Sequence, residues 1–218
     1  MKNDEVEFIG KITAGVTHEI NNVLASIREI SGLMTDILSM TDEKSFPRKE
    51  KFHTSLDKVQ NQVQRGVKLT SQLNKFSHLS DSNKTEIDLY ESIQHMIFLT
   101  ERFARIKNVS LIHQSSDKSV TLISDPLKLQ MALFNCIAYL LNHISDGGEI
   151  NLSQEKKGNE IFISISYKGE NVNTEKFFKD SSSVEELVSL HSILDNLKGT
   201  YEFDESNDAI ILKIEDRK

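Results

Sequence analysis

Apolar residues recur every three or four positions through the first forty residues. This spacing matches the turn of an α-helix and predicts one long amphipathic helix of about eight turns with a heptad-like stripe. The polar stretch "MTDEKSFPRKEK", which contains Pro47, ends the pattern and predicts a turn. The apolar positions of the stripe are Ile9, Ile12, Val16, Ile20, Val23, Ile27, Ile30, Met34 and Ile37.

A second apolar stripe follows the polar break and predicts a second long helix. Two long helices joined by a short turn form an antiparallel hairpin. Such a hairpin has too little partner surface to bury both stripes, so we expect it to pair with a second copy as a four-helix bundle. The alternative is that the hairpin packs on the rest of its own chain. The second stripe comprises Leu56, Val59, Val63, Val67, Thr70, Leu73 and Phe76.

The pattern changes after the polar segment His78 to Glu86, which reads as a linker. Strand-like and helical runs then alternate, so the predicted fold class is α+β, with domains at 1–80 and 81–218 and with helices over a mixed or antiparallel sheet in the second. Asp125 and Pro126 resemble an N-cap and first helical residue, and Gly199 fits the position just after a helix. The expected helices are 87–106, 127–144 and 184–199, and the expected strands are 109–114, 120–124, 149–155, 159–168, 200–206 and 209–216.

Composition narrows the class of protein. The chain has 218 residues and a net charge of -7, which argues against nucleic acid as a partner. Its single cysteine, Cys136, lies in an apolar run and predicts a buried thiol in a reducing compartment. The longest apolar run, Met131 to Leu141, is too short to cross a bilayer, and the N-terminus has no signal-peptide core. We therefore expect a cytoplasmic protein that does not enter the membrane.

His18 is the candidate chemical residue of the first helix because it points away from the apolar stripe. An exposed imidazole is mostly neutral at neutral pH and can attack phosphorus. Asn22, four residues on, shares its face, Gly15 leaves space beside it, and the neighbouring Glu19 could accept an imidazole N–H. An ordinary surface histidine is the alternative. A zinc motif H-E-x-x-H is excluded because Asn22 stands at the second histidine position.

The stretch "FIGKITAGVTHEINNVLASI" resembles the phosphoacceptor H-box of bacterial two-component sensor histidine kinases. The resemblance implies a dimerisation and phosphotransfer hairpin followed by an ATP-binding α/β sandwich of the GHKL type. It also implies that His18 is phosphorylated, that Glu19 is its acid/base partner, and that Asn22 orients water for phosphatase chemistry. Val23 replaces a proline that usually kinks the family's helix, so we expect a straighter helix here.

The second half is similar to the family's ATP-binding domain in layout but departs from its nucleotide motifs. Asn135 matches the first asparagine of the N-box, whereas Tyr139 stands where the family has the asparagine that holds Mg²⁺-ATP. Tyr167 replaces the adenine-binding aspartate and Asn171 replaces a glycine. No glycine occurs between Glu170 and Lys198. The resemblance therefore implies a degenerate domain that uses no cofactor of its own.

These features together predict a histidine phosphotransfer protein without ATP-dependent kinase activity. Its partners would be response-regulator receiver domains, which supply Mg²⁺, and a second copy of the chain. The docking face would include Gly15, Asn22, Ser26 and Glu29 with parts of the second helix. Three alternatives remain open: a phosphatase, a pseudokinase that pairs with a histidine kinase, and a true histidine kinase.

Overall fold

The computed structural model describes residues 2–40, 49–81, 84–114, 120–144, 146–169 and 185–216. Contacts divide the chain into two compact units. One unit contains residues 1–12 and 78–218, and the other contains residues 13–77. The predicted domains at 1–80 and 81–218 stay a prediction, and the contacts add the finding that the first twelve residues group with the C-terminal part.

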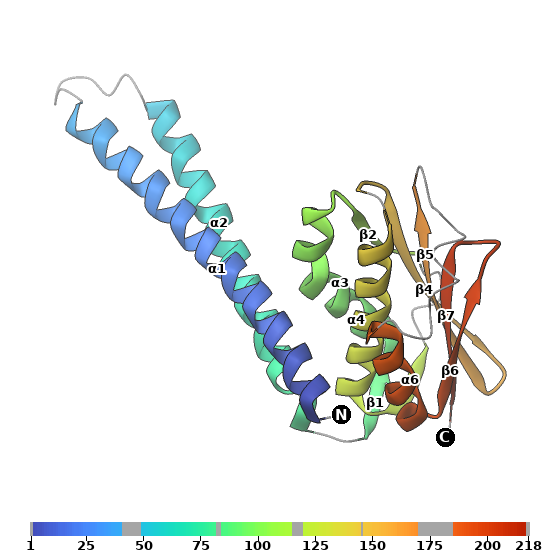
Figure 1. Cartoon of the computed structure of the whole chain (residues 1–218). Helices are drawn as coiled ribbons and strands as arrows, with labels where there is room; N and C mark the ends of the chain where they lie inside the picture. Colours follow the sequence, from blue (N-terminus) through green and yellow to red (C-terminus); the bar gives the residue numbers. More distant parts are fainter. Residues whose placement is uncertain are drawn as a thin grey trace. The chain divides into compact units, whose positions relative to one another are not determined.

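The helical hairpin consists of two long helices, as the two stripes predict. Helix α1 spans Lys2–Ser39 and helix α2 spans Lys49–Ser77 (Figure 1). The predicted turn around Pro47 lies mostly outside the described residues. Between the helices, the side chain of Val23 is buried and faces Gly66, where an added Cβ would lie 3.3 Å from its Cγ1. The two helices therefore approach closely at this level.

Several apolar side chains of the hairpin remain in contact with solvent. Leu24 is 57% exposed, Val63 is 48% exposed and Val67 is 66% exposed. All three line one open groove that also includes Ile20 and Ile27. Exposed apolar side chains in a continuous row mark an interaction surface. The predicted homodimer would cover this groove and stays a prediction.

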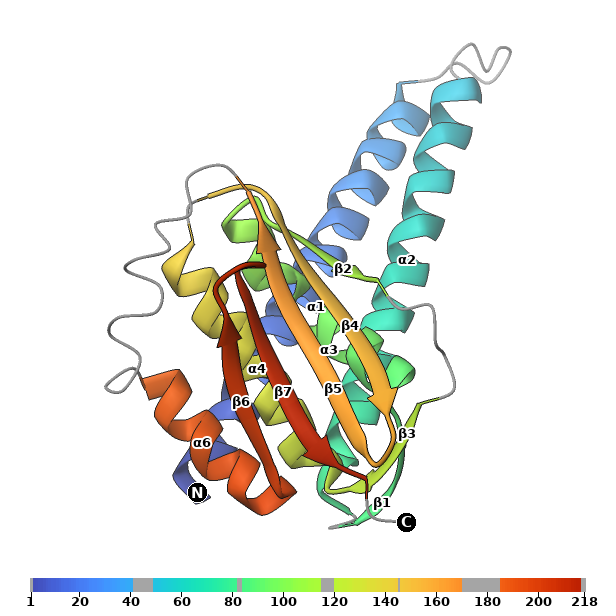
Figure 2. The same cartoon turned by 90° about the vertical axis from the view of Figure 1, so that its right-hand side faces the viewer.

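The C-terminal part is built on a mixed five-stranded sheet in the order β2-β4-β5-β7-β6. Strand β2 is parallel to β4, and the remaining pairs are antiparallel. Helices α3, α4 and α6 cover one face of the sheet, which lies in front of them in Figure 2. The strands are β2 Ser110–His113, β4 Glu149–Lys157, β5 Glu160–Lys168, β6 Gly199–Asp204 and β7 Ala209–Glu215, and the helices are α3 Leu89–Ile106, α4 Pro126–His143 and α6 Glu185–Leu197. The predicted α+β class is confirmed.

Local sequence explains the two elements that matter most for the site. Asp125 caps α4, because its carboxylate accepts a hydrogen bond from the Lys128 backbone N–H at 3.1 Å. Strand β5 buries alternate residues, namely Ile161, Ile163, Ile165 and Tyr167. Tyr167 therefore lies on the same side of the strand as the isoleucines of the core.

The first turns of α1 pack within the C-terminal unit. Phe8 is 4% exposed, and its ring meets the ring of Phe134 on α4 edge to face, with centroids 5.3 Å apart. Such aromatic pairs stabilise a core beyond their buried area. The N-terminal end of the chain is thus part of the packing of the C-terminal unit.

Two boundaries predicted from sequence are wrong. The predicted linker contains strand β1 (Thr85–Asp88), which pairs with β3 (Thr121–Ser124), and α3 begins at Leu89 because Asp88 caps it. Gly199 is not the residue after α6 that turns left-handed. Lys198 takes that conformation with φ 56°, and Gly199 opens β6, where a Cβ would lie 2.7 Å from the Lys213 carbonyl oxygen. The glycine is needed for close strand approach rather than for a helix end.

Cys136 is fully buried on α4, as predicted. Burial raises the pKa of its thiol far above the ordinary value. The side chain is therefore an unreactive part of the core. Among the helices that the structure describes, none combines the length and apolar character needed to cross a membrane.

Candidate phosphoacceptor site

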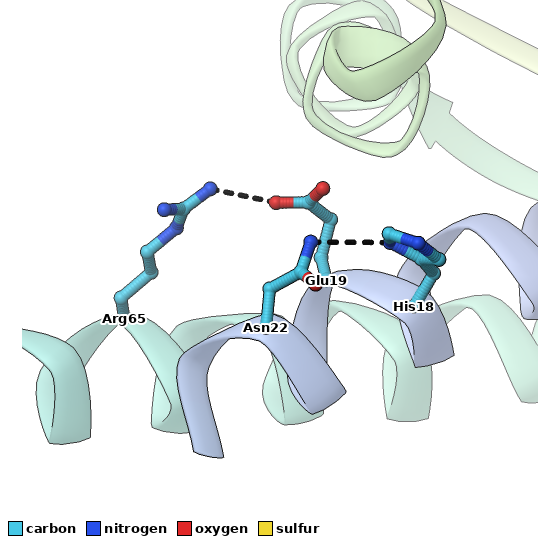
Figure 3. Close-up of polar contacts among 4 residues, drawn as sticks. All are labelled: His18, Glu19, Asn22 and Arg65. Carbon is cyan, nitrogen blue, oxygen red and sulfur yellow. Dashed lines mark hydrogen bonds and ion pairs between the residues drawn. The ribbon is translucent and has the colours of Figure 1, made fainter. Parts of the chain in front are cut away.

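His18 is exposed on α1, and its imidazole contacts Asn22, which lies one turn further along the same helix. The side-chain nitrogen of Asn22 lies 3.1 Å from Nδ1 of His18, as Figure 3 shows. The pair forms because residues four apart lie on the same helical face. Asn22 is exposed as well, so the contact presents the imidazole at the surface with one ring nitrogen engaged.

The Asn22 contact decides which ring nitrogen can react. With the amide nitrogen toward Nδ1, the amide donates and Nδ1 accepts, which places the proton of a neutral ring on Nε2. If the amide turns over, its oxygen accepts a hydrogen bond from Nδ1–H, and Nε2 keeps a lone pair. In both orientations Nδ1 is engaged. Nε2 is therefore the nitrogen that an incoming group can reach.

Glu19 is directed to the second helix. Its Oε2 accepts a hydrogen bond from Nη2 of Arg65 at 2.7 Å (Figure 3). Consecutive helix residues point about 100° apart, so Glu19 and His18 do not share a face. The acid/base role implied for Glu19 stays a prediction, and one contact of this carboxylate is the ion pair with Arg65. Sequence reasoning missed Arg65, because no local pattern connects positions 46 residues apart.

The predicted docking residues lie along α1 with different accessibilities. Asn22 and Glu29 are exposed, Ser26 is half-buried, and Gly15 is buried. Three of the four therefore offer surface beside His18. Helix α1 continues through Val23, where the resemblance implies a proline, and the expectation of a straighter helix stays a prediction.

Tyr167 fills the space at the end of β5. Its side chain is 3% exposed, and its hydroxyl donates to the Gly147 carbonyl oxygen at 3.0 Å. The ring lies directly on glycine backbone, because an added Cβ would lie 2.9 Å from the hydroxyl oxygen at Gly148 and 1.9 Å from it at Gly169. Burial raises the pKa of the Tyr167 phenol, which keeps it neutral. A neutral aromatic ring thus lies at the position where the resemblance implies a carboxylate.

Tyr139, at the position where the resemblance implies a metal-binding asparagine, is buried on α4. It is 1% exposed, and its ring stacks on that of His143 with centroids 4.2 Å apart. Burial, followed by the charges of Tyr201 and Glu186, raises the pKa of the Tyr139 phenol. Neighbouring Asn135 has a buried side-chain nitrogen without a hydrogen-bond partner.

The remaining nucleotide-motif position, Asn171, lies outside the described residues, as does the rest of the compressed lid. Within the ranges that the structure does describe, no group of three or more His, Cys, Asp or Glu side chains could hold a metal ion. The prediction that a receiver supplies Mg²⁺ is not tested by this finding.

Sequence comparison relates the chain to sensor histidine kinases. It is 23% identical to the sensor histidine kinase ZraS of Escherichia coli K12 over 171 residues, which are 78% of this chain and 35% of ZraS. It is 22% identical to the alginate biosynthesis sensor protein KinB of Pseudomonas aeruginosa over 147 residues, which are 66% of this chain and 25% of KinB. The chain thus spans about a third or less of the length of these relatives. No family model matches the chain.

Solved structures of histidine kinases share the fold. The Acinetobacter baumannii histidine kinase AdeS has a TM-score of 0.52 and 16% identity, with coverage of 92% of this chain and 98% of AdeS. Histidine kinase ThkA, in its complex with the response regulator protein TrrA, has a TM-score of 0.51 and 18% identity, with coverage of 100% of this chain and 64% of ThkA. The isolated catalytic domain of ThkA gives a TM-score of 0.52 at 20% identity over 62% of this chain and 98% of that domain.

Proposed function

We propose that this chain, which belongs by sequence and fold to the two-component sensor histidine kinase family, relays phosphoryl groups between receiver domains through His18 and does not use ATP. The observation that carries the proposal is the contrast between its two family sites. His18 is exposed with its ring oriented by Asn22, whereas Tyr167 fills the position of the adenine-binding carboxylate. Acceptance of a phosphoryl group from a protein partner requires only the first site.

The transfer step follows from the geometry of His18. Nε2 attacks the phosphorus of a partner's aspartyl phosphate in line, the bond from phosphorus to the aspartyl oxygen breaks, and the carboxylate leaves. The imidazole proton is then lost to solvent. The Asn22 side-chain oxygen, turned toward Nδ1–H, would hold the ring in the reactive tautomer. The Mg²⁺ of the receiver would neutralise charge on the phosphoryl group.

A response regulator is the expected partner class. ThkA forms a complex with the response regulator TrrA, and this chain shares the fold of ThkA. The exposed stretch Asn22 to Glu29 next to His18 would be the docking surface. A second copy of the chain would cover the apolar groove that contains Leu24 and Val67.

The residues at the nucleotide position do not fit Mg²⁺-ATP. Adenine recognition needs a carboxylate that accepts a hydrogen bond from the exocyclic amine. Tyr167 offers a neutral ring instead, and its hydroxyl already donates to the Gly147 carbonyl oxygen. Metal binding needs an oxygen ligand, and Tyr139 is stacked in the core instead. The phosphatase, the pseudokinase and the true kinase remain the alternatives that an experiment must separate.

A labelling experiment separates these functions. The protein is mixed with a receiver domain carrying ³²P-labelled aspartyl phosphate, and in parallel with γ-labelled ATP and Mg²⁺. Acid-labile label on His18 from the receiver, with none from ATP, supports a relay. Rapid release of free phosphate without label on the protein would indicate a phosphatase. Label from ATP would establish a kinase, and label that needs an added histidine kinase would indicate a pseudokinase partner.

A further inference from the structure

The contact between Arg65 and Glu19 joins the two helices at the level of His18. The guanidinium of Arg65 reaches from α2 to the carboxylate of Glu19 on α1 at 2.7 Å. The Glu19 side chain is 9% exposed, and the Arg65 side chain is 45% exposed. A carboxylate with little access to water depends strongly on a paired cation, because solvent does not screen its charge.

Gly66, the next residue of α2, reinforces the same register. An added Cβ at this position would lie 3.3 Å from Cγ1 of Val23, which follows Glu19 by one helical turn. Gly66 therefore lets the helices approach closely where the neighbouring Arg65 reaches across. The two consecutive residues of α2 fix the turn of α1 that carries His18 and Asn22.

We infer that Arg65 is a positioning residue that neutralises Glu19 and holds it away from the imidazole, so that an anionic phosphoryl group can approach His18. The inference rests on the proposed function, in which His18 accepts a phosphoryl group. A phosphoryl donor is an anion, and an uncompensated carboxylate beside the nucleophile would repel it. Paired with Arg65, the Glu19 side chain carries little net charge toward the donor.

Potassium phosphoramidate tests this inference without any protein partner. His18 Nε2 attacks its phosphorus, the bond from phosphorus to nitrogen breaks, and ammonia leaves, while the imidazole gives up its N–H proton to water. Diethyl pyrocarbonate provides the matched probe, because it is an uncharged electrophile that modifies the same ring. A charge effect slows the anionic reagent only, whereas a displaced ring slows both.

Four variants separate the contributions. Arg65→Gln is expected to slow phosphoramidate labelling of His18 by about three- to tenfold, as for a partly screened charge. Its reaction with diethyl pyrocarbonate should stay within about twofold of the wild type. In the Glu19→Gln background, the same Arg65→Gln change should slow labelling by less than about twofold, because no carboxylate is then left for Arg65 to neutralise. Arg28→Gln, which removes an exposed positive charge from the same hairpin, is the matched control and should change neither rate.

Three results would overturn the inference. The first is a slowing by Arg65→Gln that is just as large in the Glu19→Gln background, because Arg65 would then not act through Glu19. The second is equal slowing with both reagents, which would indicate a displaced ring. The third is a Glu19→Gln variant slower than Arg65→Gln, which would assign acid/base chemistry to Glu19. A wild type that phosphoramidate labels but a phosphorylated receiver does not would contradict the relay alone and leave the Arg65 result standing.

Discussion

The two positions that the resemblance singles out, at His18 and at Tyr167, are built in opposite ways. At the hairpin, the polar side chains of His18 and Asn22 project from one face of α1 and bond to each other at the surface. At the end of β5, the side chain of Tyr167 turns inward and packs on glycine backbone. The first arrangement leaves the imidazole accessible, whereas the second buries the side chain in the core.

The difference separates an exposed polar pair on a helix from a side chain that completes a buried row on a strand. Strand β5 retains the alternation that builds the core, and Tyr167 extends the row of Ile161, Ile163 and Ile165. At a position where the resemblance implies a carboxylate, the tyrosine therefore adds buried apolar surface. His18, in contrast, faces away from the apolar stripe and is exposed, so it is not part of the core.

Replacement of the phosphoacceptor has the largest expected effect. His18→Gln should abolish acid-labile labelling by a phosphorylated receiver, because no other side chain is held in its place. The helical content of the variant, measured by circular dichroism, should match the wild type since His18 is exposed. His53→Gln, at another exposed histidine of the hairpin, should label normally. Undiminished labelling of His18→Gln would contradict the hairpin half of the comparison.

One charge placed in the apolar groove of the hairpin should disrupt the proposed dimer. Val67→Glu places a carboxylate on each copy of the proposed dimer interface. Loss of two buried valines at about 1.5–3 kcal/mol each would raise the dimer Kd by about two to four powers of ten. Light scattering at micromolar concentration should then report a monomer. Val188→Glu, at an exposed valine of α6, is the control and should remain dimeric.

Truncation of Tyr167 tests the inward-facing half of the comparison. Tyr167→Ala should lower the free energy of unfolding by about 3–5 kcal/mol, the usual cost of deleting a buried aromatic side chain. Urea denaturation followed by circular dichroism measures this change, and Ile106→Ala, at an exposed side chain of α3, should cost far less. Mg-ATP should not raise the melting temperature of Tyr167→Ala, because Tyr139 still fills the metal position. A rise in the melting temperature would mean that the Tyr167 ring alone keeps Mg-ATP from binding.

Removal of the hydroxyl group alone gives a smaller effect. Tyr167→Phe keeps the ring and loses the hydrogen bond to the Gly147 carbonyl, so it should cost about 0.5–1.5 kcal/mol in the same denaturation experiment. A cost equal to that of Tyr167→Ala would show that the hydrogen bond, and not the ring, holds the end of β5.

Alkaline pH gives the smallest expected difference. Burial raises the pKa of the Tyr167 phenol, so the folded state favours the neutral form. This contribution to stability is present below the unfolded pKa of about 10 and is lost as pH rises through the folded pKa. Tyr139 and Tyr201 have pKa values raised in the same direction and keep part of the dependence. Wild type should therefore lose stability more steeply above pH 10 than Tyr167→Phe does.

Much of the fold follows from local patterns in the sequence. The stripes of α1 and α2, the cap of α4 at Asp125 and the alternation in β5 each act over a few residues, so they can be read directly. Strand β1 could not be read in this way, because four residues in a polar stretch become a strand only through pairing with β3. Packing of Phe8 against Phe134 likewise depends on residues far apart in the chain.

The residues of the candidate site also divide into those that local spacing predicts and those that it does not. His18 and Asn22 share a face at a spacing of four, so sequence alone predicts that they lie together. Arg65 comes from the other helix, and only the register between α1 and α2 decides which residue it meets. The contact of Glu19 with Arg65 therefore could not be predicted, whereas the burial of Tyr167 follows from the alternation in β5. The match of Tyr167 to the family's carboxylate stays a prediction.

The buried thiol of Cys136 is a natural probe for transient opening of the C-terminal unit. As the chain's one cysteine, it lies fully inside the core of the C-terminal unit, so an alkylating reagent reaches it only during a transient opening of that unit. When reclosing is fast, the labelling rate reports the population of open molecules, and when labelling is faster it reports the opening rate itself. Alkylation of Cys136 can thus measure the opening of the C-terminal unit without an introduced labelling site.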